Sequence, residues 1–206
     1  MNMPDSGSEL PLFPLQAVLF PDGLLGLKVF EARYLDLMGR CLREGTGFGV
    51  VALNAGTEVR SKDDAVTLES VGTLAELIEV DSEQPGILTV RCRGTTRFEV
   101  LATCQQSDGL WLARFRPLAA DPVLPPTTAL DPAARALDAA IAALNDQGAT
   151  PFLEPYRLAD AGWVANRWCE ILPLSLETRQ RLMALPDPLL RLELVHEFLR
   201  NNGLLP

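Results

Sequence analysis

The chain has 206 residues, of which 48% are hydrophobic and 22% charged, so it can bury a core and is not disordered as a whole. Its formal net charge is −9, whereas binding to phosphates requires a basic surplus, so nucleic acid is a disfavoured partner. Every apolar run is shorter than the roughly eighteen residues that a membrane span needs, so we expect no membrane association.

Neither export nor metal binding is indicated by the sequence. Residues 1–9, MNMPDSGSE, are expected to form a flexible tail and lack the basic start and apolar stretch of a signal or transit peptide. The four cysteines lie far apart and form no Cys-x-x-Cys pair, which argues against a zinc site and a dense disulfide framework. We therefore expect a cytoplasmic protein with reduced core thiols, no metal and no cofactor.

Residues 10–118 have the punctuated pattern of a β-rich subdomain. In LPLFPLQAVLFPDG, Pro14 and Pro21 are predicted to bracket one short strand, because proline lacks the amide hydrogen that a central ladder needs. The sequence Pro21-Asp22-Gly23 is then expected to turn the chain into the next strand, LLGLKVF, with Gly23 supplying the permissive conformation.

Five further strands are predicted from β-branched and aromatic runs between turn residues. They cover residues 49–54, 72–80, 86–94, 97–106 and 110–118. The stretches DSEQPG and SDG between them are typical of hairpin turns. Charged and apolar residues alternate over residues 87–93, as in a half-buried antiparallel strand. We therefore expect a barrel or a folded antiparallel sheet.

One helix is predicted to interrupt this β-rich subdomain. Apolar residues recur at helical spacing and are expected to face the core: Phe30, Tyr34, Leu37, Met38 and Cys41. Gly45 is expected to end the helix.

Five prolines between residues 117 and 132 mark the predicted domain boundary, because proline continues neither a ladder nor a helix interior. We assign residues 119–131 to a linker. Beyond it the apolar period changes to that of a helix, so residues 132–206 are predicted to form an α-helical bundle.

Four helices are predicted in this bundle. Their expected starts are Asp131, residue 160, Ser175 and the pair Asp187-Pro188. Gly148 is expected to end the first helix, and the last is expected to run to Gly203. The last helix should bury a stripe of Leu190, Leu194 and Phe198, widened by Leu192, Val195 and Leu199.

The usual catalytic constellations are missing from the sequence. The two lysines, Lys28 and Lys62, do not follow a glycine, so there is no Walker A loop. The single histidine, His196, lies among charged residues of the last predicted helix, where a solvated or capping role is favoured over a triad. Ser61-Lys62 lies in a charged loop that would not desolvate the amine. We expect no catalytic residue.

Several stretches together resemble the amino-terminal substrate-recognition domain of Lon proteases, which also occurs in free-standing Lon-domain proteins. They are LPLFPL, VLFPDG, LKVFEARYLDLMGRCL, FGVV, VGTLAEL, RGTTRFEV and LPLSLETRQRLMALPDPLLRLELV. The resemblance covers residues 10–195 in consistent order, and departs from the family at Ala32, where a proline is usual. It implies an α+β fold, with a PUA-like β subdomain followed by a helical bundle.

The resemblance also implies a non-catalytic protein- and peptide-binding module in protein quality control. It would recognise exposed hydrophobic or unfolded segments, or one specific client protein, either alone or with a separate protease or ATPase. The peptide would lie along a sheet edge or in a groove between the two subdomains. Two alternatives remain: a peptidase-associated enzyme activity, and RNA binding through the PUA-like fold.

The candidate peptide contacts are Glu31, Arg33, Tyr34, Arg97 and Trp163. The structural alternative places Phe30 and Tyr34 in the core and makes Arg97 a charge at a strand edge. Trp163 and Trp168 are five residues apart and do not share the centre of one helix face. Either one of them is partly exposed and contacts a partner, or both pack in the core.

Overall fold

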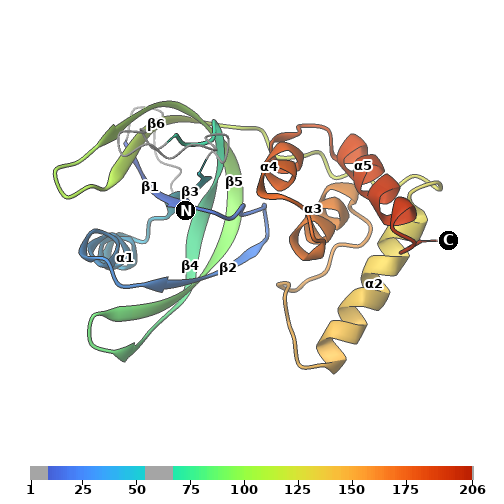
Figure 1. Ribbon diagram of the computed structural model, residues 1–206, viewed down its shortest axis with the longest axis horizontal. Helices are drawn as coiled ribbons and strands as arrows, with labels where there is room; N and C mark the ends of the chain where they lie inside the picture. Colours follow the sequence, from blue (N-terminus) through green and yellow to red (C-terminus); the bar gives the residue numbers. More distant parts are fainter. Residues whose placement is uncertain (1–8, 54–66, 206) are drawn as a thin grey trace. The chain divides into compact units, whose positions relative to one another are not determined.

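The structure, a computed structural model, describes residues 9–53 and 67–205. The chain divides into two compact units between Ala119 and Ala120 (Figure 1). Among the described residues, the first unit holds six strands and one helix, and the second holds four helices. The predicted α+β class, with a β-rich region followed by a helical one, is confirmed. Residues 1–8 of the predicted tail over residues 1–9 lie outside the described residues, as does the pair Ser61-Lys62.

The first unit is built on one six-stranded sheet. Its elements are β1 (Leu10–Leu15), β2 (Leu24–Val29), α1 (Ala32–Glu44), β3 (Phe48–Ala52), β4 (Val71–Gln84), β5 (Ile87–Gln105) and β6 (Trp111–Pro117). The strand order is β2-β5-β4-β3-β1-β6, and an additional pairing of β5 with β6 closes the last five strands into a ring. One pairing, β1 with β3, is parallel, because β2 and α1 carry the chain back to the same end before β3 begins.

The strand predicted between Pro14 and Pro21 is wrong. Strand β1 instead begins at Leu10 and contains both Pro11 and Pro14. Pro11 lies where β1 pairs only with β6, and Pro14 lies where it pairs only with β3. A proline is therefore tolerated at each position, since its missing amide hydrogen can lie on the side without a partner.

The turn predicted at residues 21–23 is present, because the Gly23 amide donates to the Phe20 carbonyl oxygen at 2.9 Å. The left-handed conformation, however, is adopted by Asp22, with φ of 58°, and not by Gly23. Asp22 tolerates this conformation better than most residues do. The loop before the turn passes so close to β5 that a Cβ on Gly94 would lie 2.1 Å from the Phe20 carbonyl oxygen.

Strand β5 is one long strand where two were predicted. A bulge after Gly94 lets it bend and continue to Gln105. Strand β4 is also longer than predicted and continues to Gln84, which shortens the following turn. Two further bulges leave Ile78 of β4 and Leu101 of β5 without cross-strand partners, and both side chains are exposed.

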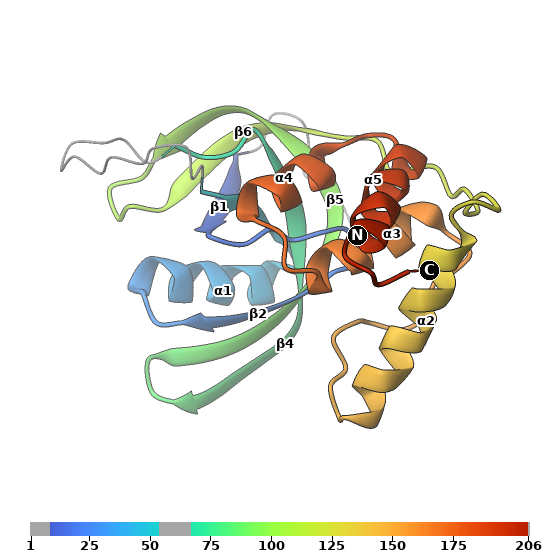
Figure 2. The ribbon, with the colours of Figure 1, turned by 45° about the vertical axis from the view of Figure 1, so that its right-hand side comes forward.

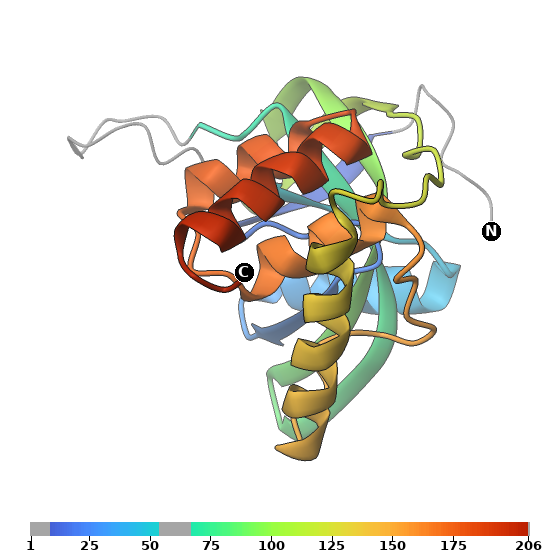
Figure 3. The same cartoon turned by 90° about the vertical axis from the view of Figure 1, so that its right-hand side faces the viewer.

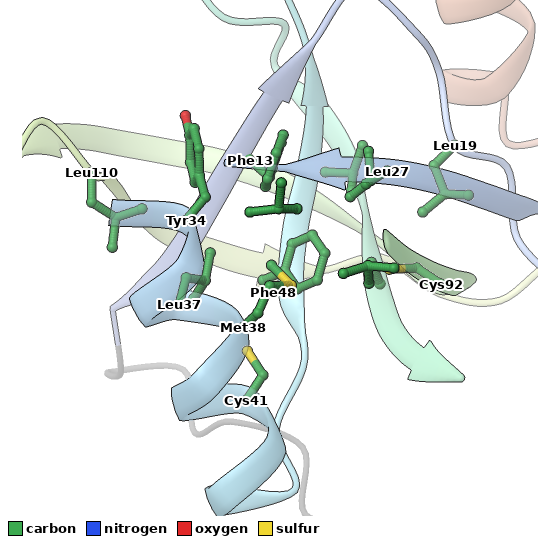
Figure 4. Close-up of a cluster of buried hydrophobic side chains, with 14 of the residues drawn as sticks. Phe13, Leu19, Leu27, Tyr34, Leu37, Met38, Cys41, Phe48, Cys92 and Leu110 are labelled. Carbon is green, nitrogen blue, oxygen red and sulfur yellow. The ribbon is translucent and has the colours of Figure 1, made fainter. Parts of the chain in front are cut away.

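Two apolar clusters fill the first unit. One receives residues from all five strands of the ring and therefore lies inside it: Leu10, Leu12, Val51, Leu74, Phe98, Ala113 and Phe115. The other joins α1 to the opposite face of the strands, as Figure 4 shows, and includes Phe13, Tyr34, Leu37, Met38, Cys41, Phe48 and Cys92. Figure 2 shows α1 running beside β2, whose Leu27 and Val29 belong to this second cluster.

The prediction that Phe30 belongs to the buried stripe of the helix is wrong. Phe30 lies between the end of β2 and the residue before α1, so it is outside the helix, and 66% of it is exposed. The other four residues of the predicted stripe are buried.

The helices of the second unit are α2 (Asp131–Asp146), α3 (Ala161–Ile171), α4 (Leu176–Ala184) and α5 (Pro188–Asn201). The predicted caps Ser175 and Asp187 are confirmed, since each side chain accepts a hydrogen bond from the first turn of its helix. Asp131 is not a cap: it is the first helical residue, and the capping position is held by Leu130 without a side-chain bond.

The predicted core face of α5 is confirmed only in part. Leu192, Val195 and Leu199 are buried as expected, together with Pro188 and Arg191. The centre of the predicted face is wrong, because Leu190 and Leu194 are exposed and Phe198 is half-buried. Figure 3 shows α5 toward the viewer. The helix carries apolar residues on two sides, and only one of them packs against the other helices.

A buried arginine joins several segments of the second unit. Arg191 donates from Nη1 to Asp121 Oδ2 at 2.7 Å and to Asn166 Oδ1 at 3.0 Å. Its Nε donates to the Leu182 carbonyl oxygen at 2.9 Å, and its Nη2 donates to that of Leu185. One guanidinium thus connects α3, α5, the end of α4 and the proline-rich segment before α2.

Candidate functional site

Three of the five candidate residues meet where β2 runs into α1. We call residues 28–34 the β2–α1 corner. Phe30 and Glu31 connect the strand to the helix, and both are exposed. Arg33 and Tyr34 belong to the first turn of α1. The corner therefore presents an aromatic side chain next to a pair of opposite charges.

Arg33 holds this corner in place. Its Nη2 donates to Glu31 Oε2 at 2.6 Å, and its Nη1 donates to the Gly109 carbonyl oxygen at 3.1 Å. Gly109 lies in the turn between β5 and β6. The side-chain amide of Gln105 donates to the same Gly109 carbonyl oxygen. Because the ion pair is partly exposed, it contributes at most about 1 kcal/mol to stability. The hydrogen bond from Arg33 to Gly109 fixes the corner against the β5–β6 turn.

Tyr34 anchors the corner to the core. Its ring stacks on Phe13 with centroids 4.1 Å apart, and the Arg33 guanidinium lies 4.9 Å from the Tyr34 centroid. Figure 4 shows the Tyr34 hydroxyl at the outer end of the cluster, pointing away from Cys41. Burial raises the pKa of Tyr34 above its usual value, while the charge of Arg33 opposes the shift.

The edge of β2 lies beside the corner. Strand β2 lies at one end of the sheet order and pairs only with β5, so its other edge has no partner among the described strands. A Cβ on Gly26 would meet no described atom within 4 Å, so the face of β2 is open at this residue. Lys28 is exposed on the same strand. An unpaired edge of this kind can accept an extended segment as an additional strand.

The remaining two candidates lie elsewhere and are buried. Arg97 lies on β5, paired with Thr73 of β4, and Trp163 packs against Phe152 and Tyr156 in the second unit. Of the two alternatives for Trp163 and Trp168, packing of both in the core is confirmed. Trp168 is also buried, and its indole donates to the Ala133 carbonyl oxygen at 3.0 Å. Any contact of Arg97 or Trp163 with a peptide stays a prediction.

Sequence reasoning missed that Phe30 is exposed. The signal was its position between a strand pattern and the first helical residue, which removes it from the helical stripe. Gly109 and the β2 edge were also missed, because the partner of Arg33 and the order of the strands depend on long-range pairing.

Residues 9–201 match the family described as the ATP-dependent protease La (LON) substrate-binding domain. The chain belongs to this family. The predicted resemblance to Lon amino-terminal domains is thereby confirmed over nearly the whole chain. No ATPase or protease domain is found within the 206 residues.

Individual relatives agree with this assignment of the Lon domain. A Lon protease of Anaeromyxobacter dehalogenans (strain 2CP-C) is 30% identical over 111 residues, which are 52% of this chain and 13% of that protein. The crystal structure of a Lon N-terminal domain protein from Xanthomonas campestris is 32% identical, with a TM-score of 0.75 over 92% of this chain and 98% of that one. The N-terminal domain of the Mycobacterium avium complex Lon protease shares the fold at 15% identity, with a TM-score of 0.61 over 92% and 97% of the two chains.

Within residues 9–53 and 67–205, no group of three or more His, Cys, Asp or Glu side chains could hold a metal ion. In the same part of the chain, no helix has both the length and the apolar character to cross a membrane.

Proposed function

We propose that this Lon substrate-binding domain protein captures exposed apolar segments of unfolded or specific client proteins at the β2–α1 corner. An extended segment would add to the free edge of β2, and one of its apolar side chains would cover Phe30. The observation that carries the proposal is Phe30 itself, an aromatic residue 66% exposed at the end of a strand that has one edge without a partner among the described strands. The client would be bound and not cut.

The corner is suited to binding because it is already ordered. Arg33 ties it to the β5–β6 turn, and Tyr34 ties it to Phe13 in the core. Because these contacts hold the neighbouring backbone, little backbone freedom is lost when a partner covers Phe30. Main-chain hydrogen bonds to β2 would supply affinity for many sequences, and Phe30 would supply the preference for apolar side chains.

A variant of Phe30 tests the proposal against a matched control. The probe is fluorescein-labelled α-lactalbumin, permanently unfolded by reduction and carboxymethylation, compared with the folded protein and with an RNA oligomer at two salt concentrations. We expect micromolar, salt-tolerant binding of the unfolded probe alone. Phe30→Ala should weaken binding about tenfold, as loss of a central aromatic contact does. Leu101→Ala, which removes an exposed apolar residue from a bulge of β5, should leave it unchanged.

The outcomes separate the alternatives. Equal affinities of the two variants would contradict a role for the corner. Binding of the RNA oligomer with a steep loss in salt would instead indicate a nucleic-acid protein. Cleavage of the unfolded probe by the purified wild type would indicate an enzyme. Alternate N-methylation of a bound client peptide should abolish binding if strand addition to β2 is correct, because it removes the donors that the edge requires.

A further inference from the structure

The exposed side of α5 forms a second apolar surface, in the helical unit. Leu190, Leu194 and Phe198 recur every fourth residue, and so lie along one stripe of the helix. Leu190 is 41% exposed, Leu194 is 44% exposed and Phe198 is half-buried. We call these three residues the α5 stripe.

The stripe is not part of the bundle core. The core side of α5 is formed by Leu192, Val195 and Leu199, all of which are almost fully buried, together with Arg191. Helix α5 thus already has the burial that holds it in the bundle. A second apolar stripe is not needed for that, and side chains at this spacing are the contacts by which one helix packs on another.

Acidic residues accompany the stripe on one flank. Glu193 and Glu197 are exposed and one turn apart, and neither forms an ion pair within the part of the chain that the structure describes. Arg200, farther along the same helix, is likewise in no described ion pair. The flank therefore presents two carboxylates next to apolar side chains, with the single guanidinium of Arg200 at its end, and its net charge is negative.

We propose that the α5 stripe docks an amphipathic helix of a partner protein that carries lysine or arginine along one flank. Apolar side chains of that helix, spaced by four, would pack on Leu190, Leu194 and Phe198. Its cations would face Glu193 and Glu197, which favours encounter and fixes the orientation.

A second copy of the chain fits this surface less well. It would bring the same two carboxylates and a further net charge of −9, so like charges would meet. An extended client fits it less well too, because a stripe on a helix offers no unpaired backbone groups. This proposal therefore concerns a different surface from the β2–α1 corner and does not depend on it.

Two designed peptides and the full chain test this proposal. The first peptide is a helix of about 18 residues, long enough to be stable alone, with leucine at every fourth position and lysine on one flank. The second carries glutamate in place of the lysines. We expect the lysine peptide to bind the wild type with micromolar affinity and the glutamate peptide to bind at least about tenfold more weakly.

Three variants then locate the surface. Leu194→Asp should abolish binding of the lysine peptide, and the double variant Glu193→Lys with Glu197→Lys should reverse the preference toward the glutamate peptide. Phe30→Ala should bind like the wild type, which separates this surface from the β2–α1 corner. Because the altered residues are exposed, each variant should keep the wild-type circular dichroism and melting temperature.

Several results would overturn the proposal. They are equal binding of the two peptides, full binding by Leu194→Asp, and an unchanged preference in the charge-reversed variant. Sedimentation that shows a dimer of the wild type, lost in Leu194→Asp, would assign the stripe to a second copy of the chain instead.

Discussion

Replacing Arg191 with methionine should destabilise the helical unit by about 3–5 kcal/mol, the cost of breaking a buried ion pair. The guanidinium is 1% exposed and donates to four acceptors, one of them the carboxylate of Asp121. Methionine fills a similar length but donates nothing, so each acceptor loses a bond worth about 1–3 kcal/mol when buried. The Asp121 side chain is 16% exposed, and access of water there keeps the total below the sum of the four losses.

The assay is urea unfolding followed by tryptophan fluorescence. Two of the three tryptophans, Trp163 and Trp168, are buried in α3 of the helical unit, whereas Trp111 lies on β6 of the first unit. Replacing Trp111 with phenylalanine in every protein compared makes the emission report on the helical unit. Far-UV circular dichroism on the same samples follows both units and shows whether they unfold in one transition.

Arg181→Met is the matched control. Arg181 forms an ion pair with Glu177, but their side chains are 78% and 67% exposed, so its loss should cost no more than about 0.5 kcal/mol. If Arg191→Met came within about 1 kcal/mol of this control, the hydrogen bonds of Arg191 would contribute nothing net, and the reasoning would be refuted. Adding Asp121→Asn to Arg191→Met should recover part of the loss, because the two residues are coupled.

Two further predictions concern a close backbone approach and the thiols. Gly94→Ala places a Cβ 2.1 Å from the Phe20 carbonyl oxygen and should lower the free energy of unfolding in urea by about 3 kcal/mol. Gly26→Ala, where the Cβ has open space, should change it by no more than about 0.5 kcal/mol. Equal losses in the two variants would contradict the close approach. Burial raises the pKa of Cys92 and Cys169 to about 12, so the free energy of unfolding, measured by urea titration, should fall as the pH rises from about 9 to 12. At about pH 8, only the exposed Cys104 should react with Ellman's reagent. A second fast-reacting thiol would contradict this prediction.

Local signals in the sequence predicted the ends of elements well. Ser175 and Asp187 cap their helices, and the turn at residues 107–109 is present, with Gly109 in the left-handed conformation. Each of these depends on a few neighbouring residues, so composition and spacing are sufficient to find them.

Features that depend on distant neighbours were predicted poorly. Whether a proline can lie inside a strand depends on whether both edges of that strand are paired, and β1 changes neighbour along its length. The two apolar sides of α5 have the same helical period, so periodicity could not tell which one packs against α3. Consequently the bounds of β1 were predicted wrongly, and of the predicted core face of α5 only Leu192, Val195 and Leu199 are buried.

The candidate site shows the same division. Glu31, Arg33 and Tyr34 were proposed from their motif, and the structure places them at one corner. Their surroundings came from long-range structure: Arg33 reaches Gly109, which is 76 residues away. Phe30 is exposed because β2 ends and α1 begins on either side of it. The hydrophobic pattern of the sequence locates such ends only to within a residue or two.

The position of β1 in the ring has a consequence for synthesis of the chain. This first strand pairs with residues 49–52 and 111–113, so the ring cannot close until about a hundred further residues have left the ribosome. Both edges of β1 are open until β3 emerges, and the edge that pairs with β6 stays open until residues 111–113 emerge. An apolar strand with an open edge is the kind of segment that pairs with other nascent chains. Pro11 and Pro14 each remove a backbone donor from it. The two prolines should therefore protect the newborn chain from aggregation before its own late strand arrives.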